Sequence, residues 1–278
     1  MVLLILINLV IFLFKKYISL NKIILNKYIM GNGCSSIEYQ NEDEFYNGRV
    51  TYKNKTPYKN GYGKLVDEKG EYIGTFKDNK KDGYGIMKYV NGDRYEGYWS
   101  NNMMEGKGEY YYNNGDKLEG FMSKDYIHGT GKLTYNNGFI YSGDFAFNVI
   151  EGSGSLHGTS KNLIYNGSWK NGVFHGKGKV YHENRKKFFS GNFINGVCNG
   201  YGKIYDFDEV KLYEGEINNG EVSEYIEDIN IFNRINDLIN YHNIYLYQGF
   251  LRQKNLNLDK YSVNENYYKI TPSAPPMI

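Results

Sequence analysis

The stretch Tyr95-Glu96-Gly97-Tyr98-Trp99, followed by Gly106-Lys107-Gly108, is one copy of a phrase that recurs along most of this 278-residue chain. The lead residues of successive copies are Tyr72, Tyr95, Leu118, Tyr141, Tyr165, Phe189 and Tyr213. Consecutive lead residues are 23 residues apart in the first three steps and 24 apart in the next three. A fixed period in this range is typical of a repeat array and not of a domain with one compact core.

Each copy has the pattern of a β-hairpin with one apolar face. Strand side chains alternate between faces, so positions one, three and five of the phrase share a face. Position five is apolar in every copy, at Phe76, Trp99, Met122, Phe145, Trp169, Phe193 and Ile217. The residue two places after each Gly-x-Gly is also apolar, at Met87, Tyr110, Leu133, Leu156, Val180 and Ile204. The opposite face is mostly polar, which indicates an antiparallel sheet packed on one side.

Glycine is as regular as tyrosine in these copies. The repeat-defining residues are the tyrosines and tryptophans Tyr72, Tyr95, Trp99, Tyr141, Tyr165, Trp169 and Tyr213, with Gly74, Gly83, Gly85, Gly97, Gly106, Gly108, Gly120, Gly129, Gly131, Gly143, Gly152, Gly154, Gly167, Gly176, Gly178, Gly191, Gly200, Gly202 and Gly215. Glycine weakens a strand, so we expect a neighbouring Tyr, Phe or Trp ring to cover the backbone that each glycine leaves bare.

Asn-Gly pairs mark tight turns, because they supply positive φ angles. They lie between copies at Asn91-Gly92, Asn114-Gly115 and Asn137-Gly138, and inside copies at Asn171-Gly172 and Asn195-Gly196. Turns in both places predict a continuous meander. The fold prediction is all-β: an elongated single-sheet antiparallel meander of seven to eight hairpins over residues 46–222.

The copies resemble a known family. The stretch from Tyr165 to Gly178 reads Tyr-Asn-Gly-Ser-Trp-Lys-Asn-Gly-Val-Phe-His-Gly-Lys-Gly and is similar, almost position by position, to the MORN repeat (membrane occupation and recognition nexus). Six full copies span 72–212, a half copy covers 213–220, and a degenerate copy starts at Tyr46. The resemblance implies scaffolding or tethering at membranes and cytoskeletal structures, with protein partners and often as a homodimer.

The amino-terminal residues allow three interpretations. Residues 1–29 are an apolar segment that is either an anchor or mis-annotated upstream sequence. Residues 30–45 hold an acylation motif and an acidic linker: with Met30 as the start, Gly31 fits N-myristoylation and Cys34 is a palmitoylation candidate. One myristoyl chain binds membrane only marginally, and a second acyl chain makes attachment stable. The third interpretation is a chance match with no anchor at all.

The period stops after Gly220. Residues 223–248 have a broad apolar helical face formed by Ile229, Ile231, Phe232, Ile235, Leu238 and Ile239. Ser223 is the expected N-cap, and the helix is expected to cover the last strand edge, with binding of a partner as the alternative. Residues 249–278 are polar, contain Pro272-Ser273-Ala274-Pro275 and are predicted to be disordered.

The sequence offers no catalytic constellation. The Gly-Lys pairs lack the spacing of a phosphate loop, and His128 and His175 have no acidic or cysteine companions. The acidic residues are expected on the solvated face, and Cys34 and Cys198 suggest no disulfide or metal site. We therefore expect no enzyme, no cofactor and no metal. The formal net charge of +2 gives no indication of nucleic-acid binding.

The sequence thus favours a membrane-tethered scaffold or adaptor on the cytoplasmic face of a plasma or internal membrane, possibly associated with the cytoskeleton. The first alternative is direct phospholipid binding by the repeats, with Lys77, Lys80, Lys81 and Arg185, Lys186, Lys187 as cationic patches. The second is a regulatory subunit of an enzyme.

Overall fold

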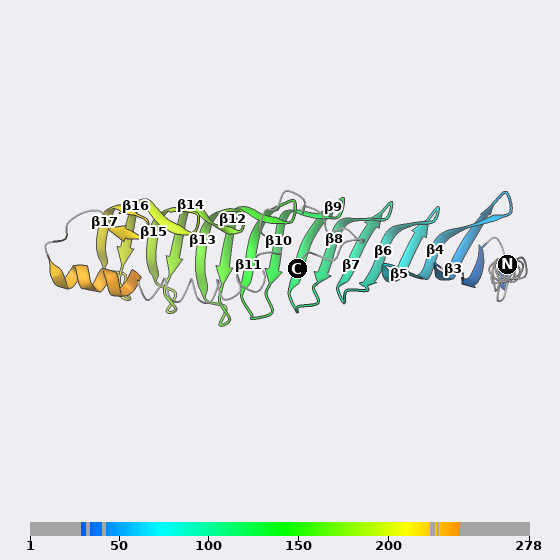
Figure 1. Cartoon of the computed structure of the whole chain (residues 1–278), viewed down its shortest axis with the longest axis horizontal. Coiled ribbons are helices and arrows are strands. Elements are labelled where there is room, and N and C mark those ends of the chain that lie inside the picture. Colours follow the sequence, from blue (N-terminus) through cyan, green and yellow to red (C-terminus); the bar gives the residue numbers. More distant parts are fainter. Residues whose placement is uncertain (1–28, 32–33, 41–42, 223–225, 227, 240–278) are drawn as a thin grey trace, which may run out of the picture. The chain divides into compact units, whose positions relative to one another are not determined.

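The computed structural model describes residues 29–31, 34–40, 43–222, 226 and 228–239. The chain divides into two compact units, Met1–Asn113 and Asn114–Ile278. Both units are built from β-strands that follow one another in chain order (Figure 1). In each unit, every strand pairs antiparallel with the strand that follows it, so the predicted antiparallel meander is confirmed.

The described residues of the first unit form eight strands. They are β1 (Ile29–Gly31), β2 (Cys34–Gln40), β3 (Phe45–Lys53), β4 (Thr56–Asp67), β5 (Gly70–Lys77), β6 (Lys80–Tyr89), β7 (Arg94–Ser100) and β8 (Met103–Tyr111). The second unit contains β9 (Lys117–Ser123), β10 (Tyr126–Thr134), β11 (Ile140–Ala146), β12 (Val149–His157), β13 (Leu163–Lys170), β14 (Val173–Tyr181), β15 (Lys187–Ile194), β16 (Val197–Tyr205), β17 (Lys211–Asn218) and β18 (Glu221–Val222). A helix over residues 229–239 follows (Figure 1).

The segment expected to be a linker is partly strand. Residues 34–40 form β2, which pairs with β3 from Ser35↔Val50 to Gln40↔Phe45. Ile37 is buried, and Tyr39 packs against the ring of Tyr46. The prediction of an acidic spacer was wrong for these residues. It relied on the number of charged residues and overlooked that Ile37 and Tyr39, two residues apart, lie on one face of a strand.

The apolar side chains form the core as predicted. All position-five residues and all residues two places after a Gly-x-Gly are between 0 and 4 % exposed. Their rings form an edge-to-face series that crosses from one repeat to the next. Tyr72, for example, lies 5.1 Å from Phe76 of its own repeat and 5.5 Å from Trp99 of the following one. These contacts are the geometry that aromatic rings prefer, so they hold neighbouring hairpins together.

The turns inside the repeats are two-residue turns with positive φ at both residues. Asn171 and Gly172 have φ of 51° and 74°, which is a type I′ turn. The Asn-Gly turns between repeats differ from this prediction. At Asn91-Gly92 the glycine alone has positive φ (89°), and its N–H donates to the Tyr89 carbonyl at 3.0 Å. This is a three-residue loop that ends in a bulge.

Both sets of turns are bonded to the neighbouring repeat. Inside the repeats, the Asn102 N–H donates to the Lys81 carbonyl (3.0 Å), and the Asn102 side-chain oxygen accepts from the Lys81 N–H (2.8 Å). Between repeats, Asp93 accepts from the Asn113 N–H (2.7 Å), and Asp116 accepts from the Asn136 N–H (2.8 Å). Within each unit, such bonds fix neighbouring hairpins at their turns as well as along their strands.

The carboxyl-terminal helix begins later than predicted. It begins at residue 229, where Asp228 caps it by accepting from the Asn230 N–H at 2.8 Å. Ser223, the expected cap, lies outside the described residues, as does everything after residue 239. Ile235 and Leu238 are buried, whereas Ile229 and Phe232 are exposed by 61 % and 37 %. The apolar face is thus narrower than the sequence pattern suggested.

Candidate functional site

The lead tyrosine of each repeat covers the glycines of its own hairpin, as expected. In the hairpin of β7 and β8, Gly97 faces Gly108 across the strands. A Cβ added to Gly97 would lie 2.4 Å from the Tyr95 hydroxyl oxygen, and one added to Gly108 would lie 2.3 Å from it. Since real Cβ atoms do not approach other atoms so closely, only glycine leaves room for the ring.

The tyrosine hydroxyl has a second role that the sequence analysis missed. It donates to the carbonyl oxygen three residues further on, beside the point where the strand register shifts. Tyr165 donates to Ser168 in this way at 2.8 Å, and Tyr141 donates to Asp144 at 2.9 Å. The same bond is made by Tyr46, Tyr72, Tyr95 and Tyr213. The signal was the preference for tyrosine over phenylalanine at position one.

The two glycines of each Gly-x-Gly serve different purposes. The first has positive φ, as Gly106 does (85°), and it lies in the bulge where Trp99 pairs with Met104 after Gly97 pairs with Gly108. The second lies under the tyrosine ring. The repeat-defining residues named from the sequence therefore share one structural function, which is to let a hairpin bend around its own ring.

Two repeats depart from this arrangement. Where Leu118 leads, the side chain of Ile127 fills the space above Gly120 and Gly131. Where Phe189 leads, its ring covers Gly191 and Gly202 but has no hydroxyl to donate. The packing function is kept in both cases and the hydrogen bond is lost.

The apolar face of the sheet is buried by the packing of these rings and glycines. Its rings are buried against one another. Even Lys81, which was expected in a cationic surface patch, is buried, and its ammonium lies 5.0 Å from the Tyr72 ring and 4.9 Å from the Trp99 ring. The accessible surfaces of the repeats are accordingly the outer face and the turns.

The outer face carries ordered charges in addition to the polar residues expected there. Glu71 lies 2.5 Å from Lys64 and 3.5 Å from Lys88, which belong to the strands on either side. Glu214 lies 2.7 Å from Lys203 and 2.5 Å from Lys211. Hydrogen bonds from these two lysines lower the pKa of Glu214 to about 2. A central carboxylate between two lysines is the recurring unit of this face.

Exposed tyrosines interrupt these charges in the first unit. Tyr62 and Tyr84 are the middle residues of Gly-x-Gly triplets, Tyr98 follows Gly97 in the first strand of its hairpin, and all three are exposed. Tyr84 and Tyr98 pair across β6 and β7 with their ring centroids 5.5 Å apart. The equivalent positions in β11 to β15 are polar, namely Asp144, Ser153, Ser168, Lys177 and Asn192.

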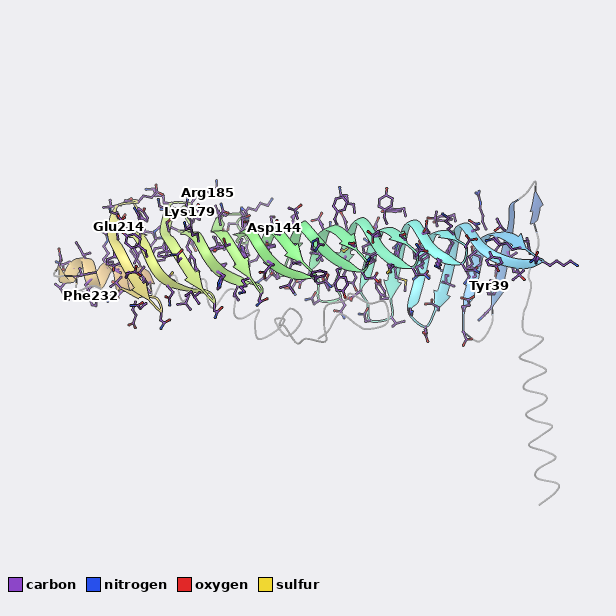
Figure 2. All side chains as sticks on the ribbon, turned by 90° about the horizontal axis from the view of Figure 1, so that it is seen from above. Tyr39, Asp144, Lys179, Arg185, Glu214 and Phe232 are labelled. Carbon is purple, nitrogen blue, oxygen red and sulfur yellow. The ribbon has the colours of Figure 1, made fainter. Side chains whose placement is uncertain are left out.

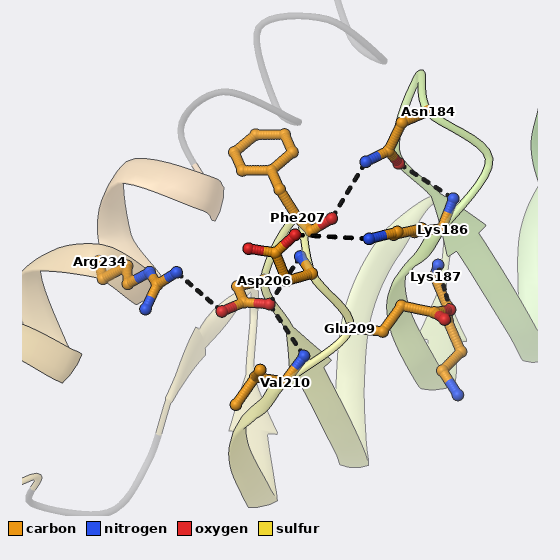
Figure 3. A network of polar contacts seen from close by, with 9 residues as sticks. Asn184, Lys186, Lys187, Asp206, Phe207, Glu209, Val210 and Arg234 are labelled. Carbon is orange, nitrogen blue, oxygen red and sulfur yellow. Dashed lines mark hydrogen bonds and ion pairs between the residues drawn. The ribbon is translucent and has the colours of Figure 1, made fainter.

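Four turn aspartates contradict the expectation that acids lie on the solvated face. Asp93, Asp116, Asp125 and Asp206 are buried. Figure 3 shows Asp206, whose carboxylate accepts from the Val210 N–H (2.9 Å) and from the Arg234 guanidinium of the helix (2.7 Å). Burial would raise the pKa of Asp206, but backbone hydrogen bonds and the Arg234 charge hold it below its ordinary value.

The second basic patch proposed from the sequence faces acidic partners. Lys186 lies 3.4 Å from Asp208, and the Lys187 N–H donates to Glu209 at 2.9 Å (Figure 3). The Lys187 ammonium lies over the Tyr205 ring at 4.1 Å. The Glu209 contact is made by the backbone N–H of Lys187, so in the part of the chain that the structure describes Lys186 forms an ion pair, whereas Arg185 and the Lys187 ammonium do not. The patch is therefore less cationic than its sequence implied.

The acylation candidates lie at the start of the described chain. Gly31 pairs with Cys34 at the end of the hairpin of β1 and β2. The apolar segment 1–28 lies outside the described residues. Within the residues described, no helix is both long and apolar enough to span a bilayer.

The described residues hold no cluster of three or more His, Cys, Asp or Glu side chains that could bind a metal ion. His128 packs against Phe147 at 5.4 Å, in agreement with a structural role. Burial raises the pKa of Cys198 to about 12, which makes its thiol a poor nucleophile at neutral pH.

Tandem hairpins with a glycine-tyrosine core and a regular outer face define a β-repeat protein. The family model of the MORN repeat matches six segments of the chain, residues 72–94, 95–117, 119–139, 141–162, 165–184 and 189–208. The chain is therefore a MORN-repeat protein, as its resemblance implied. A search of curated proteins finds no match.

Proposed function

We propose that this protein is a non-enzymatic scaffold that is tethered to a membrane and binds protein partners through its repeats. The observation that carries the proposal is the closed aromatic face. Because the large rings are used for packing, each repeat offers partners only its outer face and its turns. Such a surface presents similar rows of charged and polar groups at a regular spacing, which suits recognition of another protein.

The tether is the acylated amino terminus. Its support is the motif at Met30-Gly31 and the position of Cys34, whose backbone pairs with that of Gly31. Acyl chains attached to Gly31 and Cys34 would therefore extend from neighbouring positions of the backbone. Two acyl chains are what stable membrane attachment requires. The first repeats would then lie at the cytoplasmic face of the membrane, near any cytoskeletal partner.

Mass spectrometry of the natural amino terminus tests the tether. We expect an acylated Gly31 as the first residue, and an intact peptide that begins at Met1 would refute it in favour of the apolar segment as anchor. Fractionation of Gly31→Ala and Cys34→Ser variants gives a second readout. Each should move protein from the membrane to the soluble fraction, whereas Cys198→Ser should leave the distribution unchanged.

Direct phospholipid binding by the repeats is the competing function. The burial of Lys81 and the ion pair of Lys186 with Asp208 weigh against it. Sedimentation of the unacylated chain with anionic vesicles separates the two functions, and salt-sensitive co-sedimentation would favour lipid recognition. A pull-down would reveal an enzyme partner, and light scattering would reveal a homodimer.

A further inference from the structure

We propose that the outer face of strands β13, β14 and β15 binds an acidic, extended segment of a protein partner. This inference deepens the proposed scaffold function, because it assigns the chemistry of the partner and the part of the repeats that holds it. The surface is defined by Lys177 and Lys179 of β14, bordered by Asn166, Ser168, Ser190 and Asn192 of the two neighbouring strands. We call it the β14 surface.

The two lysines of the β14 surface have no carboxylate beside them. Lys177 pairs in register with Asn192, and Lys179 pairs with Asn166 on one side and Ser190 on the other. Both side chains are exposed, and neither forms an ion pair among the residues that the structure describes. Figure 2 shows Lys179 on the same side of the second unit as Arg185.

This arrangement differs from the other lysines of the outer face. Lys64 and Lys88 share Glu71, and Lys117 and Lys132 share Glu119. Lys203 and Lys211 share Glu214. In each of those units two lysines share one carboxylate. The lysines of Glu71 lie on the two flanking strands, whereas Glu119 and Glu214 each pair with one lysine of their own strand and one of a neighbouring strand. The β14 surface keeps the lysines, but serines and asparagines stand where the acid would be.

The spacing of the lysines fits an extended chain. Residues two apart on a strand are roughly 6.6–7 Å apart and point to the same face. Alternate acidic residues of an extended segment have the same spacing, so two carboxylates can meet Lys177 and Lys179 together. The hydroxyl and amide groups of Ser190 and Asn192 can bond to the backbone of such a segment. Arg185, in the turn after β14, adds a third cation that forms no ion pair.

Few cations of this region lack an ion pair among the described residues. They are Lys177, Lys179, Arg185 and Lys187, whose ammonium lies over the Tyr205 ring. A nucleic-acid site contacts about 6–10 phosphates, and recognition of an anionic membrane by a basic cluster takes about 4–8 lysines or arginines, so four cations are too few for the first and at the lower limit for the second. Two lysines spaced along one strand suffice for a short acidic segment. Exposed ion pairs contribute little each, so we expect weak and salt-sensitive binding.

Fluorescence anisotropy with a labelled peptide tests the assignment. The probe is a peptide of alternating glutamate and serine, about eight residues long, since that length extends over ~26 Å and nearly matches the nine-residue strand β14 along which it would lie. We expect the full-length double variant Lys177→Gln/Lys179→Gln to bind it about tenfold more weakly, which is the loss of two pairs at about 0.7 kcal/mol each. The matched control Lys64→Gln/Lys88→Gln removes the same charge from lysines that share Glu71, and it should stay within about twofold of the unsubstituted protein.

Further arms make each outcome decisive. A Lys177→Glu/Lys179→Glu variant should lose the acidic peptide and gain binding to a lysine-serine peptide of equal length. Equal weakening by the control variant would overturn the proposal, because it would show an effect of net charge alone. The proposal would also be overturned if vesicles of phosphatidylserine and phosphatidylcholine bind through Lys177 and Lys179 and the acidic peptide does not bind. Far-ultraviolet circular dichroism checks that each variant is folded. If the natural protein carries no acyl chain, the membrane tether is refuted, but binding of the peptide to the β14 surface is unaffected. The tether and the β14 surface can therefore fail separately.

Discussion

Moving one hydroxyl group between two adjacent repeats should change the stability of the second unit in opposite directions. Tyr165 donates its hydroxyl to the Ser168 carbonyl at 2.8 Å, whereas Phe189 occupies the equivalent position without a donor. Both rings lie over a glycine pair. In Tyr165→Phe the packing stays and the hydrogen bond is lost. In Phe189→Tyr the hydrogen bond to the Asn192 carbonyl can form.

The expected size follows from the environment of the bond. A neutral intramolecular hydrogen bond contributes about 0.5–1.5 kcal/mol net, so Tyr165→Phe should lower the free energy of unfolding by ~1 kcal/mol. The Phe189 ring is shifted toward the first glycine of its pair, with its Cζ atom 2.5 Å from a Cβ built on Gly191 and 2.8 Å from one built on Gly202. An added hydroxyl must displace the ring by a few tenths of an ångström, so Phe189→Tyr should gain only ~0.5 kcal/mol.

Urea unfolding followed by tryptophan fluorescence measures both effects. Trp169 lies 5.3 Å from Tyr165 and reports on this region, and Trp99→Phe removes the only other tryptophan. Phenylalanine occupies that position in other repeats, at Phe76 and Phe145. With a slope of about 2 kcal/mol/M, Tyr165→Phe should shift the midpoint down by ~0.5 M. The reasoning is refuted if Tyr165→Phe leaves the midpoint unchanged, or if Phe189→Tyr destabilises as much as Tyr165→Phe.

Gly97→Ala should destabilise by more than about 2 kcal/mol because its Cβ would meet the Tyr95 ring and the Gly108 backbone, whereas Gly129→Ala, with open space but positive φ, should lose about 1 kcal/mol. Thermal melts compare the two, and equal losses would contradict the ring-over-glycine account. Raising the pH should unfold the protein: burial raises the pKa of several tyrosines above the unfolded value near pH 10, so their stabilising contribution is complete below about pH 10 and falls as the pH rises further. The tyrosinate absorbance and circular dichroism should change together, and the tyrosines concerned are Tyr46, Tyr72, Tyr141 and Tyr165. Arg234→Ala should increase amide exchange in residues 229–239 by loss of the pair with Asp206, while Arg185→Ala should leave it unchanged; similar exchange in both variants would show that Ile235 and Leu238 alone hold the helix.

The period and the alternation of side chains were sufficient to predict the hairpins and their core. Position five and the position after Gly-x-Gly were assigned correctly because strand geometry leaves a residue only two faces. The sequence also predicted that an aromatic ring covers each glycine. It did not predict that this ring belongs to the lead tyrosine of the same hairpin, because the position of the ring depends on bulges such as the one at Gly106, which the alternation of side chains does not encode.

The turns and the ends were harder to predict. Asp93 and Asp116 look like ordinary turn residues, and their burial arises from backbone N–H groups of the next turn, about twenty residues away. Lys81 appears in a run with Lys80 but alternates to the apolar face. The helix start was misplaced because Ser223 and Asp228 are both acceptable caps. For the β14 surface, each residue was visible in the sequence, but the missing carboxylate becomes apparent only when neighbouring strands are aligned.

The bond from each lead tyrosine to its own backbone has a consequence for side-chain motion. A ring that is held at its tip by a carbonyl and pressed on two glycines cannot rotate about its long axis until the hairpin opens locally. Tyr141 and Tyr165 should therefore show separate magnetic resonance signals for the two sides of each ring, while Phe189, which is untied at its tip, should turn over faster. The rate of these turns would report, repeat by repeat, how often each hairpin loosens.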